Sequence, residues 1–152
     1  MGEETPIREF ALVIMSALCQ ASESVCVIAA LKTNIIRDVV KFLECVDATI
    51  HQVVSIKGME YRNHADQIGT TPGMLKKAVS ILLSIIQYEA CRKPFIKFSD
   101  NFIKLIVSQF VDPELITPLA SLIHMIQPAI IKNGIPVESF NFPDIRIVDF
   151  EK

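Results

Sequence analysis

The sequence of 152 residues carries 15 Lys and Arg against 17 Asp and Glu, a formal net charge of −2, and 51% of its residues are hydrophobic. This length suits one domain with one core. The basic residues are dispersed, so the sequence lacks the basic patch of a nucleic-acid-binding protein, and we expect no direct nucleic-acid contact. A mean hydropathy of +0.40 indicates either helices buried on several sides or an apolar surface that a partner covers.

The longest apolar run, from Phe10 to Leu18, is too short to span a bilayer, and no cationic segment precedes it as in a signal peptide. We therefore expect no membrane association. Four cysteines, none of them in a CxxC pair, fall on or next to apolar helical segments: Cys19, Cys26, Cys45 and Cys91. We expect all four to be buried free thiols in an intracellular protein.

Helix starts are marked where proline follows a capping residue, because proline at the first helical position gives up only an unpaired backbone donor. Such pairs are Thr5-Pro6, Thr71-Pro72, Asp112-Pro113 and Thr117-Pro118, and further caps are Asn34 and Ser99 or Asp100. The pattern predicts an all-α protein with helices over 6–19, 23–31, 35–56, 72–90, 100–110 and 113–126. Pro118 is expected to break or kink the last helix if it does not start a new one.

Two of these helices differ in how their apolar residues are distributed. In 35–56 the apolar residues recur at helical spacing, and Arg37, Lys41, Glu44 and His51 fall on the opposite, polar face. In 72–90 only a narrow polar line interrupts the apolar surface. Helix 35–56 is therefore expected to have one face in the core and one in solvent, whereas helix 72–90 is expected to pack against several neighbours.

The segments between and after these helices are polar or irregular. The stretch 57–70 is predicted to be a long surface loop between two blocks of three helices. Each block has the size of an armadillo-type unit, so we expect an armadillo- or HEAT-like domain over 5–126. Residues 127–152 are expected to form an extended, irregular tail, with a weak strand pattern at 144–150.

The sequence contains no pattern that predicts catalysis, a cofactor or a metal. There is no G-x-S-x-G, and the five glycines have no phosphate-binding spacing. His64 and Asp66 are a single loop pair, whereas a structural zinc site needs four ligands. His51 is expected to be solvated on its polar helix face. We therefore predict a nonenzymatic role with no catalytic, cofactor-binding or metal-binding residues.

The candidate interface residues are polar or charged side chains on two segments. On helix 35–56 they are Arg37, Lys41, Glu44 and His51, and at the end of helix 72–90 they are Arg92 and Lys93. Arg92 and Lys93, at the end of helix 72–90, could bind a phosphate or an acidic partner. Their attraction to the carbonyl end of the helix explains the same pattern, and we favour that explanation.

Several stretches resemble a known family in their order along the chain. They are "FLE" at 42–44, "MLKKAVSILLSI", "CRKPFIKFSDNFIKLIVSQFVDPEL" and "LIHMI", preceded by "REFALVIMSALCQASESVCVIAALKTNIIRDVVKFLE". Together, over roughly 8–126, they resemble the C-terminal region of the large Osa-type subunit of SWI/SNF chromatin remodelling complexes, which carries an AT-rich interaction domain elsewhere. Cys91 and the pair Gln109-Phe110 depart from the family's pattern.

The resemblance implies an armadillo-like fold and a nuclear, noncatalytic scaffold that gathers core SWI/SNF subunits and anchors the ATPase subunit. The AT-rich interaction domain is absent from these residues, so DNA binding is not implied. Under this interpretation, the apolar helix at 10–19 packs on an upstream repeat of a longer chain.

Two alternatives stay open at this level. One is a generic armadillo or HEAT-type adaptor that binds a linear peptide in a groove lined by 35–56 and 113–126. The other is a small enzyme or ligand carrier, which requires an enclosed pocket with converging polar groups.

Overall fold

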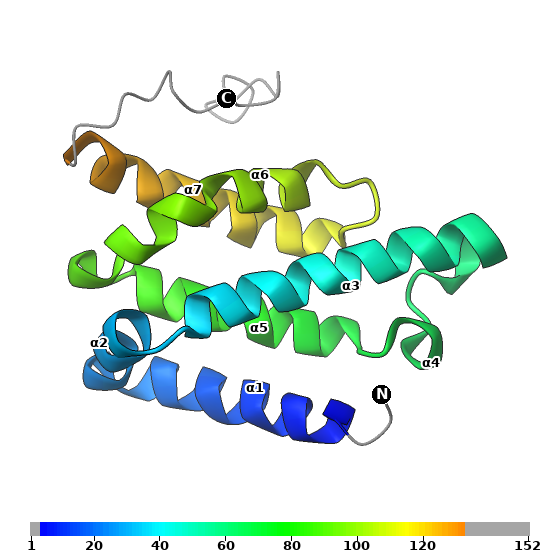
Figure 1. Cartoon of the computed structure of the whole chain (residues 1–152), viewed down its shortest axis with the longest axis horizontal. Coiled ribbons are helices and arrows are strands. Elements are labelled where there is room, and N and C mark those ends of the chain that lie inside the picture. Colours follow the sequence, from blue (N-terminus) through cyan, green and yellow to red (C-terminus); the bar gives the residue numbers. More distant parts are fainter. Residues whose placement is uncertain (1–3, 133–152) are drawn as a thin grey trace.

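The structure is a computed structural model that describes residues 4–132, and this part of the chain is helical without any β-strand (Figure 1). The all-α prediction is confirmed, while the armadillo-like arrangement stays a prediction. The α-helices are α1 (Glu4–Ala21), α2 (Glu23–Lys32), α3 (Ile35–Lys57), α4 (Ala65–Ile68), α5 (Pro72–Ile86), α6 (Ser99–Val107) and α7 (Pro113–Lys132). Short 3₁₀ turns cover Met59–Tyr61, Glu89–Cys91 and Lys93–Phe98.

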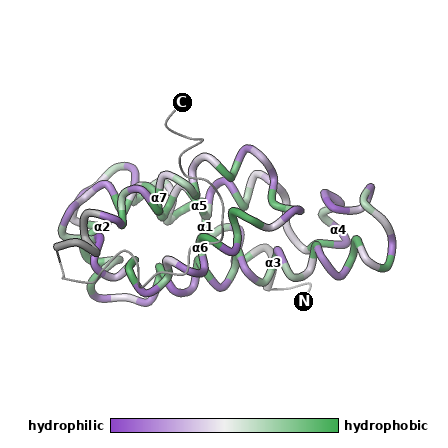
Figure 2. The backbone as a smooth tube through the Cα atoms, turned by 90° about the horizontal axis from the view of Figure 1, so that it is seen from above, coloured by the Kyte–Doolittle hydropathy of each residue, from purple (hydrophilic) through white to green (hydrophobic). Residues whose placement is uncertain are grey.

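The polar segment predicted as a loop at 57–70 contains a 3₁₀ turn and the short helix α4. Gly69, with φ of +86°, ends α4 in the left-handed conformation that glycine adopts without strain. Thr71 then begins α5, since its hydroxyl oxygen accepts a hydrogen bond from the backbone N–H of Met74 at 3.3 Å. Seen from above, α4 lies at the end of the molecule opposite α2 (Figure 2).

The C-terminal ends of α5 and α7 differ most from the predicted bounds. α5 stops at Ile86 and not at residue 90, and the guanidinium of Arg92 donates to the carbonyls of Ile86 and Gln87 at 2.9 and 3.1 Å. These bonds satisfy carbonyls that the helix end leaves without partners. α7 continues to Lys132, past Pro118 and past the predicted end at 126. The weak strand pattern at 144–150 lies outside the described residues.

The core is organised around α5, which packs against α1, α2, α3 and α7. Six of its fifteen residues are fully buried: Ala78, Val79, Ile81, Leu82, Ile85 and Ile86. Figure 1 shows α5 between α1 on one side and α6 and α7 on the other. The expectation that this apolar helix packs against several neighbours is confirmed.

The cysteine prediction is wrong for one residue of the four. Cys19, Cys26 and Cys91 are buried free thiols, but Cys45 is exposed. Cys45 lies four residues after Lys41 and three before Ala48, both exposed, so helical spacing places it on the outer face of α3. Its neighbour Val46 occupies the buried face instead.

Candidate protein-interaction surface

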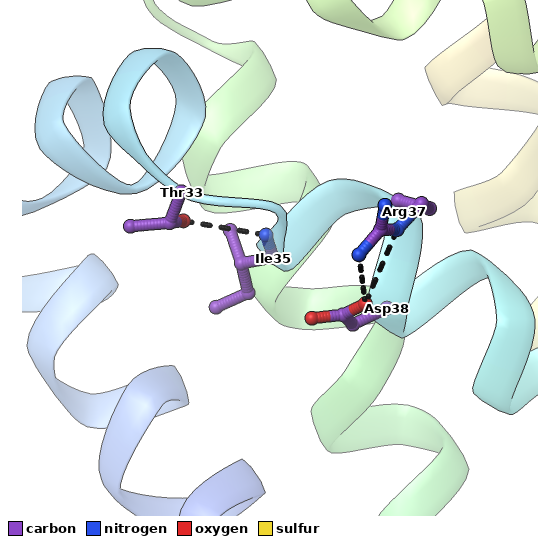
Figure 3. Close-up of polar contacts among 4 residues, drawn as sticks. All are labelled: Thr33, Ile35, Arg37 and Asp38. Atoms are coloured by element: carbon purple, nitrogen blue, oxygen red, sulfur yellow. Dashed lines mark hydrogen bonds and ion pairs between the residues drawn. The ribbon is translucent and has the colours of Figure 1, made fainter.

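Arg37 and Lys41 lie exposed on the first half of α3, as the polar-face pattern predicts. The guanidinium of Arg37 lies 3.5 Å from the Asp38 carboxylate, and the two side chains are 48% and 64% exposed (Figure 3). An ion pair this exposed contributes little to stability. Both cations are therefore accessible to a partner at small cost to the fold.

Glu44 and His51, predicted on the same polar face, are used within the protein. The amide of Asn101 on α6 donates to the Glu44 carboxylate at 2.8 Å. His51 Nε2 lies 3.1 Å from the hydroxyl of Ser108, the residue that follows the last turn of α6. The His51 side chain is still 43% exposed, so part of it is solvated, as predicted, while Nε2 faces Ser108. The second half of this polar face therefore holds α3 against α6.

The contact at His51 brings a serine, a histidine and an aspartate together. Ser108 donates to Asp47 Oδ1 at 2.6 Å, and Asp47 Oδ2 lies 3.5 Å from His51 Nε2. In a nucleophilic triad the acid contacts the ring nitrogen opposite the one that faces the serine. Here both contacts use Nε2, and the aspartate binds the serine directly. The geometry is that of a link between helices, with Phe110 edge-on to the imidazole at 4.4 Å between ring centroids.

Arg92 and Lys93, the remaining predicted residues, have different surroundings. Arg92 is partly buried and directed to the carbonyl end of α5, as the dipole interpretation of this pair anticipates. Lys93 is exposed on the following 3₁₀ turn. Of the six candidate interface residues, three thus face solvent: Arg37, Lys41 and Lys93.

An open groove that sequence reasoning missed lies where α1, α2 and the start of α3 meet. It has a volume of about 420 Å³ and a mainly apolar lining: Met15, Val25, Ile28, Ala29, Thr33, Asn34, Ile35 and Asp38. Its rim carries the polar side chains of Thr33 and Asp38. The Thr33 hydroxyl accepts a hydrogen bond from the backbone N–H of Ile35 at 3.3 Å, and the Asp38 carboxylate faces Arg37 (Figure 3). We call this site the α2–α3 groove.

Asn34 precedes α3, as predicted, but its side chain makes no capping hydrogen bond. The hydroxyl of Thr33 accepts the bond from the start of the helix instead. The Asn34 side chain is thereby left at the rim of the α2–α3 groove, exposed to solvent.

A second pocket lies between α3, α4 and the start of α7, and it has a volume of only about 40 Å³. That space suits a few water molecules. Within the described residues, no cluster of three or more His, Cys, Asp or Glu side chains has the arrangement to hold a metal ion. No helix of the described range is long and apolar enough to cross a bilayer.

Burial raises the pKa of three thiols near the base of α2. The pKa of Cys19 rises to about 11, with the neighbouring Cys26 as a second cause, and burial also raises the pKa of Cys26 and of Cys91. The Cys26 thiol donates to the carbonyl of Cys19 at 3.1 Å. Because a raised pKa keeps a thiol protonated, these three side chains behave as packing residues.

Comparison with known proteins links the chain to one family. A family model described as SWI/SNF-like complex subunit BAF250/Osa matches residues 1–75. The Trithorax group protein osa of Drosophila melanogaster is 24% identical over 126 residues, which are 82% of this chain and 5% of that protein. The chain thus spans a small part of the relative's length, and no solved structure matches it. The resemblance to the BAF250/Osa family of SWI/SNF-like complex subunits, first indicated by the sequence, is therefore confirmed.

Proposed function

We propose that this chain is a noncatalytic protein-interaction domain of a nuclear SWI/SNF-type chromatin remodelling complex subunit. In this role it gathers core subunits and anchors the ATPase subunit, and thereby acts in transcription regulation. The observation that carries the proposal is the family match, because that family is described as a complex subunit. The helical scaffold and its exposed apolar and cationic surface suit a role in assembly.

The α2–α3 groove with the neighbouring cations is the surface we assign to subunit binding. Its apolar lining includes Ile28, which is 56% exposed and would gain from burial against a partner. Arg37 and Lys41 lie on the helix that forms one wall, and they favour a partner with acidic residues beside its apolar contacts. Such a mixture of an apolar centre and a charged rim is the usual composition of a specific interface.

The alternative of a peptide-binding adaptor receives less support. Its groove was expected between 35–56 and 113–126, where the structure has the pocket of about 40 Å³. This volume is too small for the side chains of an extended peptide, since ligand sites typically measure about 300–1,000 Å³. The same comparison counts against an enclosed ligand site there.

The proposal is tested by capture from nuclear extract and by binding to purified subunits. The immobilised chain is expected to recover SWI/SNF core subunits together with the ATPase, and recovery of none of them contradicts the proposal. Purified ATPase and purified core subunits, added separately and together, then show whether the ATPase is bound directly or through the core.

A charge-reversal pair locates the surface. Arg37→Glu with Lys41→Glu is expected to weaken subunit capture at least tenfold while the melting temperature stays nearly unchanged, because both side chains are exposed. The matched control is Lys77→Glu with Lys104→Glu, which reverses two exposed charges on α5 and α6. Equal loss in both double variants would show that only net charge matters.

A further inference from the structure

Thr70 is a buried residue with a polar atom that the surrounding residues do not satisfy. It is 4% exposed, and within residues 4–132 its hydroxyl has no hydrogen-bond partner. Buried hydroxyl groups in native proteins are nearly always hydrogen-bonded to protein or to ordered water, because an unpaired one loses its bonds to bulk water without compensation. The Thr70 hydroxyl therefore requires a partner other than the residues that surround it.

The place of Thr70 in the chain gives its hydroxyl no role in packing. Thr71 is the N-cap of α5, so Thr70 precedes the cap and Leu75 is the fourth residue of the helix. These two positions normally hold apolar residues that pack on each other and fix the entry of the chain into the helix. Valine has the shape of threonine and would serve this purpose without a buried polar atom. The hydroxyl is therefore the part of Thr70 that packing does not use.

Thr70 and Leu75 both line the pocket of about 40 Å³ between α3, α4 and the start of α7, which we call the Thr70 pocket. The loop before α5 and the loop before α7 both contribute to it, and Figure 1 shows these loops at the same end of the molecule. A cavity needs about 10–15 Å³ of such space to hold a water molecule, whereas a benzene-sized ligand needs about 150 Å³. The Thr70 pocket is therefore large enough for water and too small for an organic ligand.

The charges around the Thr70 pocket favour a neutral ligand. Asp47 and Asp112 disfavour an anion, and Arg62 disfavours a cation. Water is neutral and both donates and accepts hydrogen bonds, but it needs about two to four polar partners. Besides Thr70, the lining provides five polar or charged side chains: Asp47, Arg62, Asn63, Thr71 and Asp112. The pocket thus has enough hydrogen-bonding groups to hold a water molecule.

We propose that the Thr70 pocket binds an internal water molecule, which is hydrogen-bonded to the Thr70 hydroxyl and links the start of α5 to the other walls of the pocket. Arg8 provides a contrast, because its Nε is also buried without a partner in the described range, but Arg8 lines neither of the two pockets described. Its guanidinium donates to the carbonyl of Gly69 at 3.0 Å and lies 4.9 Å from the centre of the Phe42 ring. The water site lies outside the α2–α3 groove, so it does not depend on the proposed function.

Oxygen-17 magnetic relaxation dispersion, which counts long-lived water molecules in solution, tests the site in the 152-residue chain. The unaltered chain is expected to hold one such water more than Thr70→Val, which keeps the shape of the side chain and removes the hydroxyl. The matched control is Thr49→Val, because the Thr49 hydroxyl donates to the Cys45 carbonyl at 2.9 Å and lines neither pocket. This control is expected to leave the count unchanged. Equal counts in the unaltered chain and in Thr70→Val overturn the proposal.

Thermal unfolding gives a second readout. A hydroxyl that is hydrogen-bonded to water loses a partner in Thr70→Val, so the melting temperature is not expected to rise. A hydroxyl without any ligand would make Thr70→Val more stable, because the substitution removes an unpaired buried group. A rise of about 4 °C or more therefore overturns the proposal.

Filling the pocket tests whether the water is shared between its walls. Val111 lines the pocket from the loop before α7, and Val111→Ile adds one methylene there. This substitution is expected to displace the water and to lower the melting temperature of the unaltered chain. In the Thr70→Val background it is expected to lower the melting temperature less, or to raise it, because no hydroxyl then loses its partner. Circular dichroism checks that each variant folds, and equal shifts in the two backgrounds contradict the proposed water.

Discussion

The hydrogen bond between Ser108 and Asp47 is expected to be a main polar link between α3 and the end of α6. The two oxygens are 2.6 Å apart, and the Asp47 side chain is only 20% exposed. Ser108→Ala leaves that carboxylate with His51 as a more distant partner at 3.5 Å. Hydrogen bonds to charged groups contribute about 1.5–3 kcal/mol, and partial exposure lowers this range. We therefore expect Ser108→Ala to lower the free energy of unfolding by about 1–2 kcal/mol.

Urea unfolding of a double-mutant cycle measures this link. The cycle consists of Ser108→Ala, Asp47→Ala and the double variant, and a coupling free energy of about 1 kcal/mol is expected between the two sites. The control is Ser121→Ala, because the exposed Ser121 hydroxyl donates only to a carbonyl of its own helix, and its loss is expected to cost under about 0.5 kcal/mol. The reasoning would be refuted if the changes in the free energy of unfolding of the two single variants simply add in the double variant. It would also be refuted if Ser108→Ala lowers the free energy of unfolding no more than Ser121→Ala does.

Three further predictions concern the thiols and the start of α5. A thiol-specific reagent near pH 8 is expected to modify Cys45 quickly and the other three thiols slowly; a fast phase that persists in Cys45→Ser would contradict this exposure pattern. Because burial raises the pKa of Cys19 from 9.0 to about 11, the folded state holds that proton more tightly than the unfolded state. The protonated Cys19 thiol therefore contributes to the free energy of unfolding below pH 9, and this contribution is lost as the pH rises toward 11, by about 1.4 kcal/mol per unit of pKa difference. In urea unfolding, Cys19→Ala is expected to make the free energy of unfolding less dependent on pH in this range, and an unchanged pH dependence would count against the reasoning. Thr71→Ala removes the hydroxyl that accepts from the N–H of Met74 and is expected to cost about 1 kcal/mol in thermal unfolding; a loss equal to that of Thr49→Ala, whose hydroxyl donates within its own helix, would show that the cap contributes little.

The positions of the long helices could be predicted because their signals are local. The Thr71-Pro72 pair marks the start of α5, and helical spacing separates the buried face of α3 from its outer face. The end of α5 could not be predicted in the same way. It depends on Arg92 folding back onto the carbonyls of Ile86 and Gln87, which competes with continuation of the helix.

The candidate site was predicted less well because exposure on a helix face does not say what lies opposite. Glu44 and His51 share a polar face with Arg37 and Lys41, but their partners Asn101 and Ser108 are each 57 residues away in sequence. Pairings over such separations depend on how α3 and α6 pack, which periodicity does not specify. The α2–α3 groove was missed for the same reason, since its lining comes from three helices.

The sequence by itself determined the helical class, the amphipathic face of α3, the apolar surround of α5 and the resemblance to BAF250/Osa subunits, because each rests on local spacing or on the order of motifs. Only the tertiary structure decided which polar residues stay free for partners and which apolar residues stay uncovered. The run from Phe10 to Leu18 illustrates the difference. Its composition shows that the segment is apolar all round, but only the packing of α1 against α5 decides that Leu12 is buried and Ile14 faces outward.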